Sequence, residues 1–265
     1  MQASSRRVER VGVVALAAAG VAVVVLPLAG LLQRVAWSSI AGDLTSHEAL
    51  TALRLSIETS IAALALSTLV GVPLAWVLAR RTFPGRTVVR ALVTLPMVLP
   101  PVVGGIALLY AFGRRGLAGS VLYDLTGWRL VFDTTGAVLA ETFVAMPFLV
   151  VSAEAAFRSI DRGAEEAAAT LGAGAAYRFR RITLPAVAPA LAAGAALTWA
   201  RALGEFGATI TFAGNLAGKT QTMPLLVYLD IESGQEHTAL ALSVVLLAVS
   251  LAVLVGLRHR WLGNP

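Results

Sequence analysis

Six long apolar segments dominate this chain, and each is long enough to cross a lipid bilayer. A membrane-spanning helix needs about 20 predominantly apolar residues to cross a hydrocarbon core about 30 Å thick. The segments lie at about residues 11–32, 57–79, 91–112, 136–157, 186–213 and 239–257. They lack the strict alternation of β-strands, and a helix satisfies its own backbone hydrogen bonds in lipid. The sequence therefore predicts an all-α, polytopic membrane protein with six transmembrane helices in one domain over residues 1–265.

The composition excludes most soluble classes of protein. Only 14% of the residues are charged, against about 25% in an average soluble domain. The absence of cysteine excludes a disulfide framework, a thiolate nucleophile and a cysteine-based metal site. The net charge of +6 comes from arginines that lie in short clusters between the apolar segments. A nucleic-acid-binding chain would instead carry them along one basic stripe, so no nucleic-acid partner is expected.

The arginine clusters predict the orientation in the membrane. With both termini in the cytoplasm, the cytoplasmic segments hold 14 of the 21 basic residues, the external loops hold 6, and Arg201 lies within the fifth segment. The excess of positive charge on one side favours this orientation. The first apolar segment follows a basic stretch but is too long for a cleaved signal, so we interpret it as a retained span. The predicted location is the plasma or inner membrane, in contact with lipid, with cytoplasmic N- and C-termini.

A few ionisable residues lie inside the apolar segments, where charge is costly. Glu58, Glu141 and Glu154 are near segment ends, and we expect them to reach headgroup water. Arg201 and Glu205 are four residues apart in the fifth segment, so their side chains share one helix face and can pair. Two interpretations stay open: a structural ion pair that holds helices in register, or a polar path on which Arg201 attracts anions.

The residues around this pair are candidates for the translocation path or its gate. They combine small residues, which allow close approach, with hydroxyl groups that can donate hydrogen bonds. The candidate set is Arg201, Gly204, Glu205, Phe206, Gly207, Thr209 and Thr211.

Prolines predict interrupted helices in the same region of the protein. Pro96, Pro100 and Pro101 lie within the third apolar segment, and Pro147 lies within the fourth. Each proline removes a backbone donor and clashes one turn back, so a kink or break is expected. Kinked helices beside a buried polar pair are typical of moving parts around a transport path.

The longest predicted cytoplasmic loop, residues 158–185, contains a short helix. Its composition favours helix from about Asp161 to Leu171, with Asp161 as the N-cap and Gly172 at the end. Ala164, Ala167, Ala168 and Leu171 then fall on one face of small side chains. From these residues alone, a solvated surface helix and a helix that docks into another protein remain equally open.

The spacing within this loop carries a family resemblance. Glu166-Ala-Ala is followed by three residues and Gly172, then by nine residues and Ile182-Thr-Leu-Pro185. This pattern resembles the EAA loop of permease subunits of binding-protein-dependent ABC importers at every position. Residues 95–105 and 201–224 also resemble the corresponding stretches of molybdate permeases, with sulfate permeases next nearest.

The resemblance implies the function and the partners. It implies the transmembrane fold of a type I importer, in which two copies of the subunit form the pore for molybdate. It also implies two ATP-binding cassette subunits, which bind ATP and Mg²⁺, and an extracytoplasmic oxyanion-binding protein. The residues that it implies for coupling to the ATPase are Ala164, Glu165, Glu166, Ala167, Ala168, Leu171 and Gly172.

The same reasoning assigns this chain no catalytic residue, no metal site and no cofactor of its own. It lacks the G-x-x-x-x-G-K-[ST] loop that cradles ATP phosphates, so hydrolysis would belong to the partner and the chain is not an enzyme. Alternatives are import of tungstate, sulfate or thiosulfate, a passive anion channel, or a polytopic membrane enzyme. Against the last, His47, His237 and His259 lie outside the apolar segments.

Overall fold

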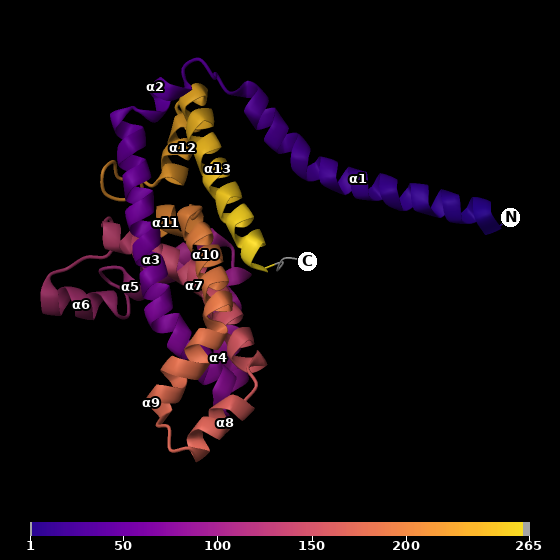
Figure 1. Cartoon of the computed structure of the whole chain (residues 1–265). Helices are drawn as coiled ribbons and strands as arrows, with labels where there is room; N and C mark the ends of the chain where they lie inside the picture. The colour runs from indigo at the N-terminus through magenta and orange to yellow at the C-terminus, as the bar shows by residue number, and fades with distance from the viewer. Residues whose placement is uncertain (1, 262–265) are drawn as a thin grey trace.

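The computed structural model describes the chain from residue 2 to residue 261, with side chains described from Gly12 to Gly256. Every regular element in this part of the chain is a helix (Figure 1). The long helices are α1 (Gln2–Arg34), α3 (His47–Arg80), α7 (Thr134–Ser159), α10 (Leu184–Leu203) and α13 (Glu236–Trp261). The shorter ones are α2 (Ile40–Leu44), α4 (Arg86–Thr94), α5 (Pro101–Phe112), α6 (Gly119–Thr126), α8 (Gly163–Thr170), α9 (Ala175–Arg178), α11 (Gly207–Phe212) and α12 (Met223–Glu232).

The prediction of an all-α, multi-span membrane protein is confirmed. Within the described part, five helices are long and apolar enough to cross a membrane. A sixth crossing results if α4 and α5, which meet at an angle of 118°, count as one broken span. The predicted interruption of the third apolar segment therefore takes the form of a sharp turn.

The centre of the fold is a bundle of α3, α7 and α10, which pack on one another along most of their length. One face of α3 carries small residues at intervals of three and four, which brings the neighbouring backbones close. These residues are Ala49, Ala52, Ser56, Ser60, Ala63, Ser67, Gly71 and Ala75. A Cβ at Gly71 would lie 3.1 Å from Val150 Cγ2 of α7, and one at Gly194 of α10 would lie 2.8 Å from Ser152 Cβ. Small side chains thus set the packing distance of the bundle.

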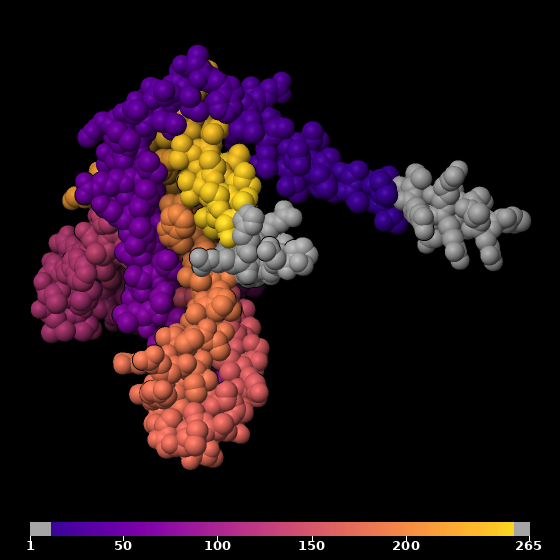
Figure 2. All heavy atoms as spheres, in the orientation of Figure 1, coloured from indigo at the N-terminus to yellow at the C-terminus, as the bar shows by residue number. Residues whose placement is uncertain are grey.

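The two ends of the bundle are built differently. At one end, the loop between α11 and α12 lies beside the start of α7, where Thr134 Oγ1 donates to the carbonyl oxygen of Lys219 at 2.8 Å. The start of α12 meets α3, because the Met223 amide donates to Ser56 Oγ at 2.7 Å. The opposite end consists of α8 and α9, which form the lower lobe of the molecule (Figure 2). Helix α1 extends away from the bundle and contacts α13 (Figure 1).

The helices differ from the predicted apolar segments in three places. Helix α3 begins at His47 instead of near residue 57, because its first turns carry polar side chains that hydropathy does not mark as a span. The fifth segment is not one helix over 186–213: α10 ends at Leu203 and α11 begins at Gly207. The segment Met223–Glu232, which was not predicted, forms α12.

Candidate functional site

The loop helix α8 is shorter than predicted but has well-defined ends. The Asp161 carboxylate accepts a hydrogen bond from the Gly163 amide at 2.9 Å, and Arg162 occupies the N-cap position that was predicted for Asp161. At the other end Gly172 has φ +85°, which favours glycine. The Ala173 amide donates to the Ala168 carbonyl oxygen at 2.9 Å, and that of Gly172 to Ala169 at 3.0 Å. These two bonds satisfy the last carbonyl groups and end the helix in a Schellman motif.

One face of α8 is exposed and carries small and apolar side chains. Ala164 and Ala167 are exposed, Ala168 is half-buried, and Leu171, directly after the helix, is 88% exposed. Glu166 is exposed as well. Small side chains and one large apolar side chain, Leu171, are therefore what this part of the loop exposes.

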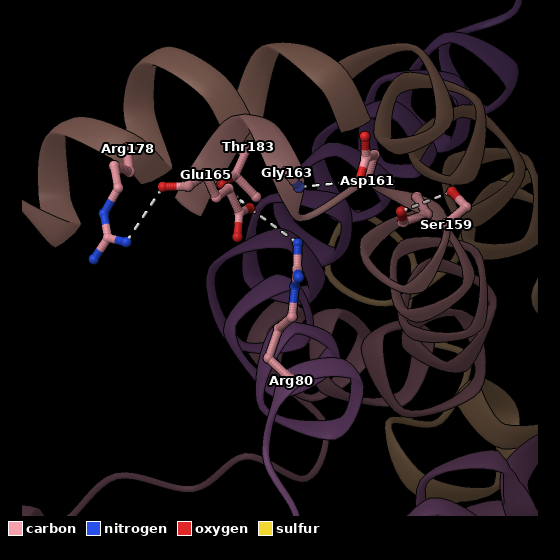
Figure 3. A network of polar contacts seen from close by, with 8 residues as sticks. Arg80, Ser159, Asp161, Gly163, Glu165, Arg178 and Thr183 are labelled. Atoms are coloured by element: carbon pink, nitrogen blue, oxygen red, sulfur yellow. Dashed lines mark hydrogen bonds and ion pairs between the residues drawn. The ribbon is translucent and has the colours of Figure 1, made fainter. Parts of the chain in front are cut away.

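Glu165 is half-buried and connects α8 to two other elements (Figure 3). Its Oε1 lies 2.9 Å from Arg80 Nη2 at the last residue of α3. The same oxygen accepts a hydrogen bond of 2.6 Å from Thr183 Oγ1, in the π-helical turn Phe179–Thr183 that leads into α10. Glu165 therefore links the loop helix to both α3 and α10. Sequence reasoning grouped it with its neighbours and did not identify these partners.

The second candidate region surrounds the break between α10 and α11. Arg201 Nη2 lies 2.6 Å from Glu205 Oε2, so the predicted pairing is present. Glu205 is 1% exposed, whereas the Arg201 side chain is 29% exposed. The other carboxylate oxygen, Glu205 Oε1, accepts a hydrogen bond from the Ala208 amide at 2.9 Å in the first turn of α11. Glu205 thus holds the two helix segments together across the break.

A hollow of about 280 Å³ opens beside this break. Two residues of α5 line it, Pro101 and Val102. The broken segment contributes the rest of the lining: Arg201, Gly204, Glu205, Phe206 and Gly207. Phe206 also packs against Tyr228 of α12, with ring centroids 5.0 Å apart. The structure therefore brings Arg201, Gly204, Glu205, Phe206 and Gly207 together around one hollow.

The two predicted threonines are not part of this hollow. Thr211 Oγ1 donates to the Gly207 carbonyl oxygen of its own helix at 2.7 Å, and Thr209 is fully buried. Both lie on α11, and neither lines the hollow.

Glycines allow α5 and α11 to touch along their backbones. A Cβ at Gly105 would lie 2.9 Å from the Ala208 carbonyl oxygen, and one at Gly207 would lie 2.7 Å from Pro101 Cβ. Both distances are shorter than real Cβ contacts, so any larger side chain would separate the helices.

The prolines differ in their effect on the backbone. Pro96 lies in the 3₁₀ turn Leu95–Met97, Pro100 precedes α5, and Pro101 is its first residue, where proline fits a helix. All three are at the turn between α4 and α5. Pro147 lies inside α7, which runs through it as one continuous helix.

Two acidic residues that were expected to reach headgroup water are instead buried. Glu141 is 2% exposed, and its Oε1 accepts a hydrogen bond from Thr59 Oγ1 of α3 at 2.8 Å. Glu154 is 6% exposed, and its Oε1 lies 3.0 Å from Arg90 Nε of α4 and 3.0 Å from Arg158 Nη2. The prediction placed them by their distance from segment ends, but helix packing covers both. The Glu58 side chain, by contrast, is 52% exposed and pairs with Arg54.

Among the residues whose side chains the structure describes, Gly12 to Gly256, no group of three or more histidine, aspartate or glutamate side chains lies close enough to hold a metal ion.

Comparison with known proteins agrees with this architecture. Residues 71–264 match the family model of the binding-protein-dependent transport system inner membrane component. The chain belongs to this family.

Relatives of the permease span nearly its whole length. It is 46% identical over 246 residues to the molybdenum transport system permease protein ModB of Mycobacterium tuberculosis. The aligned region covers 92% of each chain. The permease is 34% identical over 237 residues to the sulfate transport system permease protein CysT of Salmonella typhimurium, covering 88% of this chain and 84% of that one.

The fold of the permease matches a solved transporter. A crystal structure of a bacterial alginate ABC transporter, in complex with an alginate-bound periplasmic protein, superimposes with a TM-score of 0.73 over 92% of each chain at 18% identity. At this identity the likeness concerns the fold, which is that of an ABC importer permease.

Proposed function

We propose that this permease is the membrane-embedded subunit of an ATP-driven molybdate importer. The observation that carries the proposal is the 46% identity to a molybdenum permease over 92% of both chains. The shorter and weaker likeness to a sulfate permease, at 34% identity, makes another tetrahedral oxyanion the second candidate. Two copies of the chain would enclose the path, and an external binding protein would deliver the anion.

The loop 158–185 is the proposed point of coupling to an ATPase subunit. The exposed side chains of Ala164, Ala167 and Leu171 support docking into a groove of that partner. The two alanines are small and all three side chains are apolar, so the helix could lie close against an apolar groove. Glu166 and Gly172 would position and end the docking helix. Movement of α8 would reach α3 and α10 through Glu165, Arg80 and Thr183.

The broken segment at Gly204–Phe206 is the proposed gate. Helices on either side of a break can change their angle without unfolding, and the Arg201–Glu205 pair bridges this one. Arg201 is the partner that stays partly exposed, and it borders the hollow. A weak attraction of the anion to Arg201 fits a path, since tight binding would prevent release.

The experiment that tests the proposal is reconstitution of the permease in liposomes with its ATPase and binding protein. Each oxyanion is added in turn, and the stimulation of ATP hydrolysis is measured. We expect the largest stimulation with molybdate and a comparable one with tungstate, whose dianion is nearly equal in size. If only sulfate or thiosulfate stimulated ATP hydrolysis, that anion and not molybdate would be the substrate. Anion flux without ATP or partners would instead indicate a passive channel.

A further inference from the structure

A second hollow, of about 330 Å³, lies where the end of α3 meets the loop 158–185. Trp76, Arg80 and Arg81 line it from α3. From the loop, Arg162, Glu165, Glu166 and Arg178 contribute the charged part of the lining. It is separate from the break at Gly204, and it adjoins the Arg80–Glu165 pair through which the proposed coupling would act.

The lining of this hollow is predominantly basic. Four arginines face two glutamates, and one glutamate, Glu165, is already neutralised by Arg80 at 2.9 Å. Arg81, Arg162 and Arg178 then share the hollow with Glu166 alone. Three guanidinium groups against one carboxylate leave an excess of positive charge that attracts anions.

The bonding state of Arg178 also indicates a missing anionic partner. Its Nε atom is buried and has no hydrogen-bond partner among the described residues. Its Nη1 reaches only a backbone oxygen, that of Glu165, at 3.5 Å. A buried donor without an acceptor is costly, and an anion oxygen in the hollow would satisfy it.

The remaining contacts suit the region where a helix leaves the bilayer. The Arg81 guanidinium lies over the Trp76 ring, 5.7 Å from its centroid. Tryptophan and arginine at a helix end are typical of the headgroup layer. Basic hollows between helices at that level bind phosphate-bearing headgroups, because a guanidinium group matches phosphate oxygens in a two-bond fork.

We propose that this hollow binds a phosphate group through Arg81, Arg162 and Arg178. Its source is either the headgroup of an anionic phospholipid or free phosphate, and both offer the oxygens that these arginines lack. The bound group would join α3 to the loop helix beside the Arg80–Glu165 pair. The site would therefore adjust how firmly α8 is held.

Lipid binding to the full chain, purified in detergent, tests the proposal. Native mass spectrometry counts the phosphatidylglycerol molecules that stay bound, with phosphatidylcholine as the neutral lipid. Inorganic phosphate is titrated separately into lipid-free protein by calorimetry. Arg178→Gln and Arg81→Gln are compared with Arg180→Gln, an exposed arginine of the same loop that does not line the hollow.

We expect both hollow variants to bind about tenfold more weakly than the wild type, because each loses one charge-assisted contact to phosphate. Arg180→Gln should bind like the wild type. Selective retention of phosphatidylglycerol identifies a lipid site, and saturable phosphate binding identifies a free-anion site. Equal weakening in all three variants, or no binding of either probe by the wild type, would overturn the proposal. Arg81 is exposed, so its variant keeps the test decisive if Arg178→Gln does not fold.

Discussion

Neighbouring side chains of the loop helix have opposite surroundings, although the sequence gives them the same charge. Glu166 is exposed, while Glu165 contacts Arg80 and Thr183. These partners are 85 and 18 residues away in the chain. An ion pair across that separation depends on helix packing, which local sequence patterns do not report.

Replacing Glu165 tests its role as a link. In Glu165→Gln the charge pair with Arg80 is lost, and the coupling weakens by about 1 kcal/mol, equal to about a fivefold change. We expect a fivefold lower ratio of molybdate transported to ATP hydrolysed. The control is Glu58→Gln, which breaks the exposed pair with Arg54 and should leave the ratio unchanged. An unchanged ratio in Glu165→Gln would show that the link is only structural.

Arg201 has two possible roles, which a pair of variants separates. Arg201→Ala leaves the Glu205 carboxylate buried without its cation, which destabilises the protein by about 3 kcal/mol. Adding Glu205→Gln removes the unpaired charge and should restore the thermal unfolding midpoint. If Arg201 attracts the anion, uptake stays low in the double variant. Recovery of both stability and uptake would assign Arg201 to structure alone.

Asp230 of α12 gives the stability a pH dependence. Burial, and then the nearby Glu48, raise the pKa of the Asp230 carboxyl above its ordinary value of 3.8. The folded state therefore holds this proton more tightly, and stability falls as the pH rises from 3.8 through the raised pKa. We expect Asp230→Asn to unfold at a higher temperature than the wild type at pH 7 and to lose this dependence. A lower unfolding temperature at pH 7 would contradict the assignment.

Among the elements, α5 and α11 meet with no room for an added side chain at two glycines. Gly105 and Gly207 let the two backbones meet, and the hollow beside Arg201 opens at the same junction. The structure therefore places the proposed gate where a single methyl group changes the distance between helices.

Two alanine substitutions test this contact. Gly105→Ala puts a Cβ 2.6 Å from Thr211 Cβ, which forces the helices apart and should cost about 1–3 kcal/mol. We expect reduced uptake and a lower unfolding midpoint. Gly30→Ala in α1 is the matched control, because a Cβ at Gly30 would have nothing within 4 Å and the residue lies outside the proposed gate. If both variants transport equally well, close packing at Gly105 is not required.

The sequence predicts the elements that cross the bilayer better than those that do not. Apolar length identified α1, α7 and α13, and the Pro96–Pro101 cluster identified the turn before α5. It did not reveal the outer turns of α3, because a helix of 34 residues is about 50 Å long and extends beyond the bilayer. The break at Gly204–Phe206 was also missed, since Arg201 and Glu205 four residues apart were interpreted as a pair on one continuous helix.

At the scale of the whole molecule, the two proposed sites lie at different levels of one bundle. The loop helix α8 is at one end, and the broken segment is further along α10 (Figure 1). Helix α10 follows the π-helical turn that contacts Glu165, and it ends at the break beside Arg201. A displacement of α8 therefore has one continuous helix through which to reach the proposed gate.

We propose that this permease moves molybdate across the membrane only when an ATPase drives it. The most direct test is uptake of labelled molybdate into liposomes that contain the permease, its ATPase and its binding protein. We expect uptake that requires ATP and the binding protein and that falls in Glu165→Gln. Uptake of the same size without ATP, or with the permease alone, would contradict it.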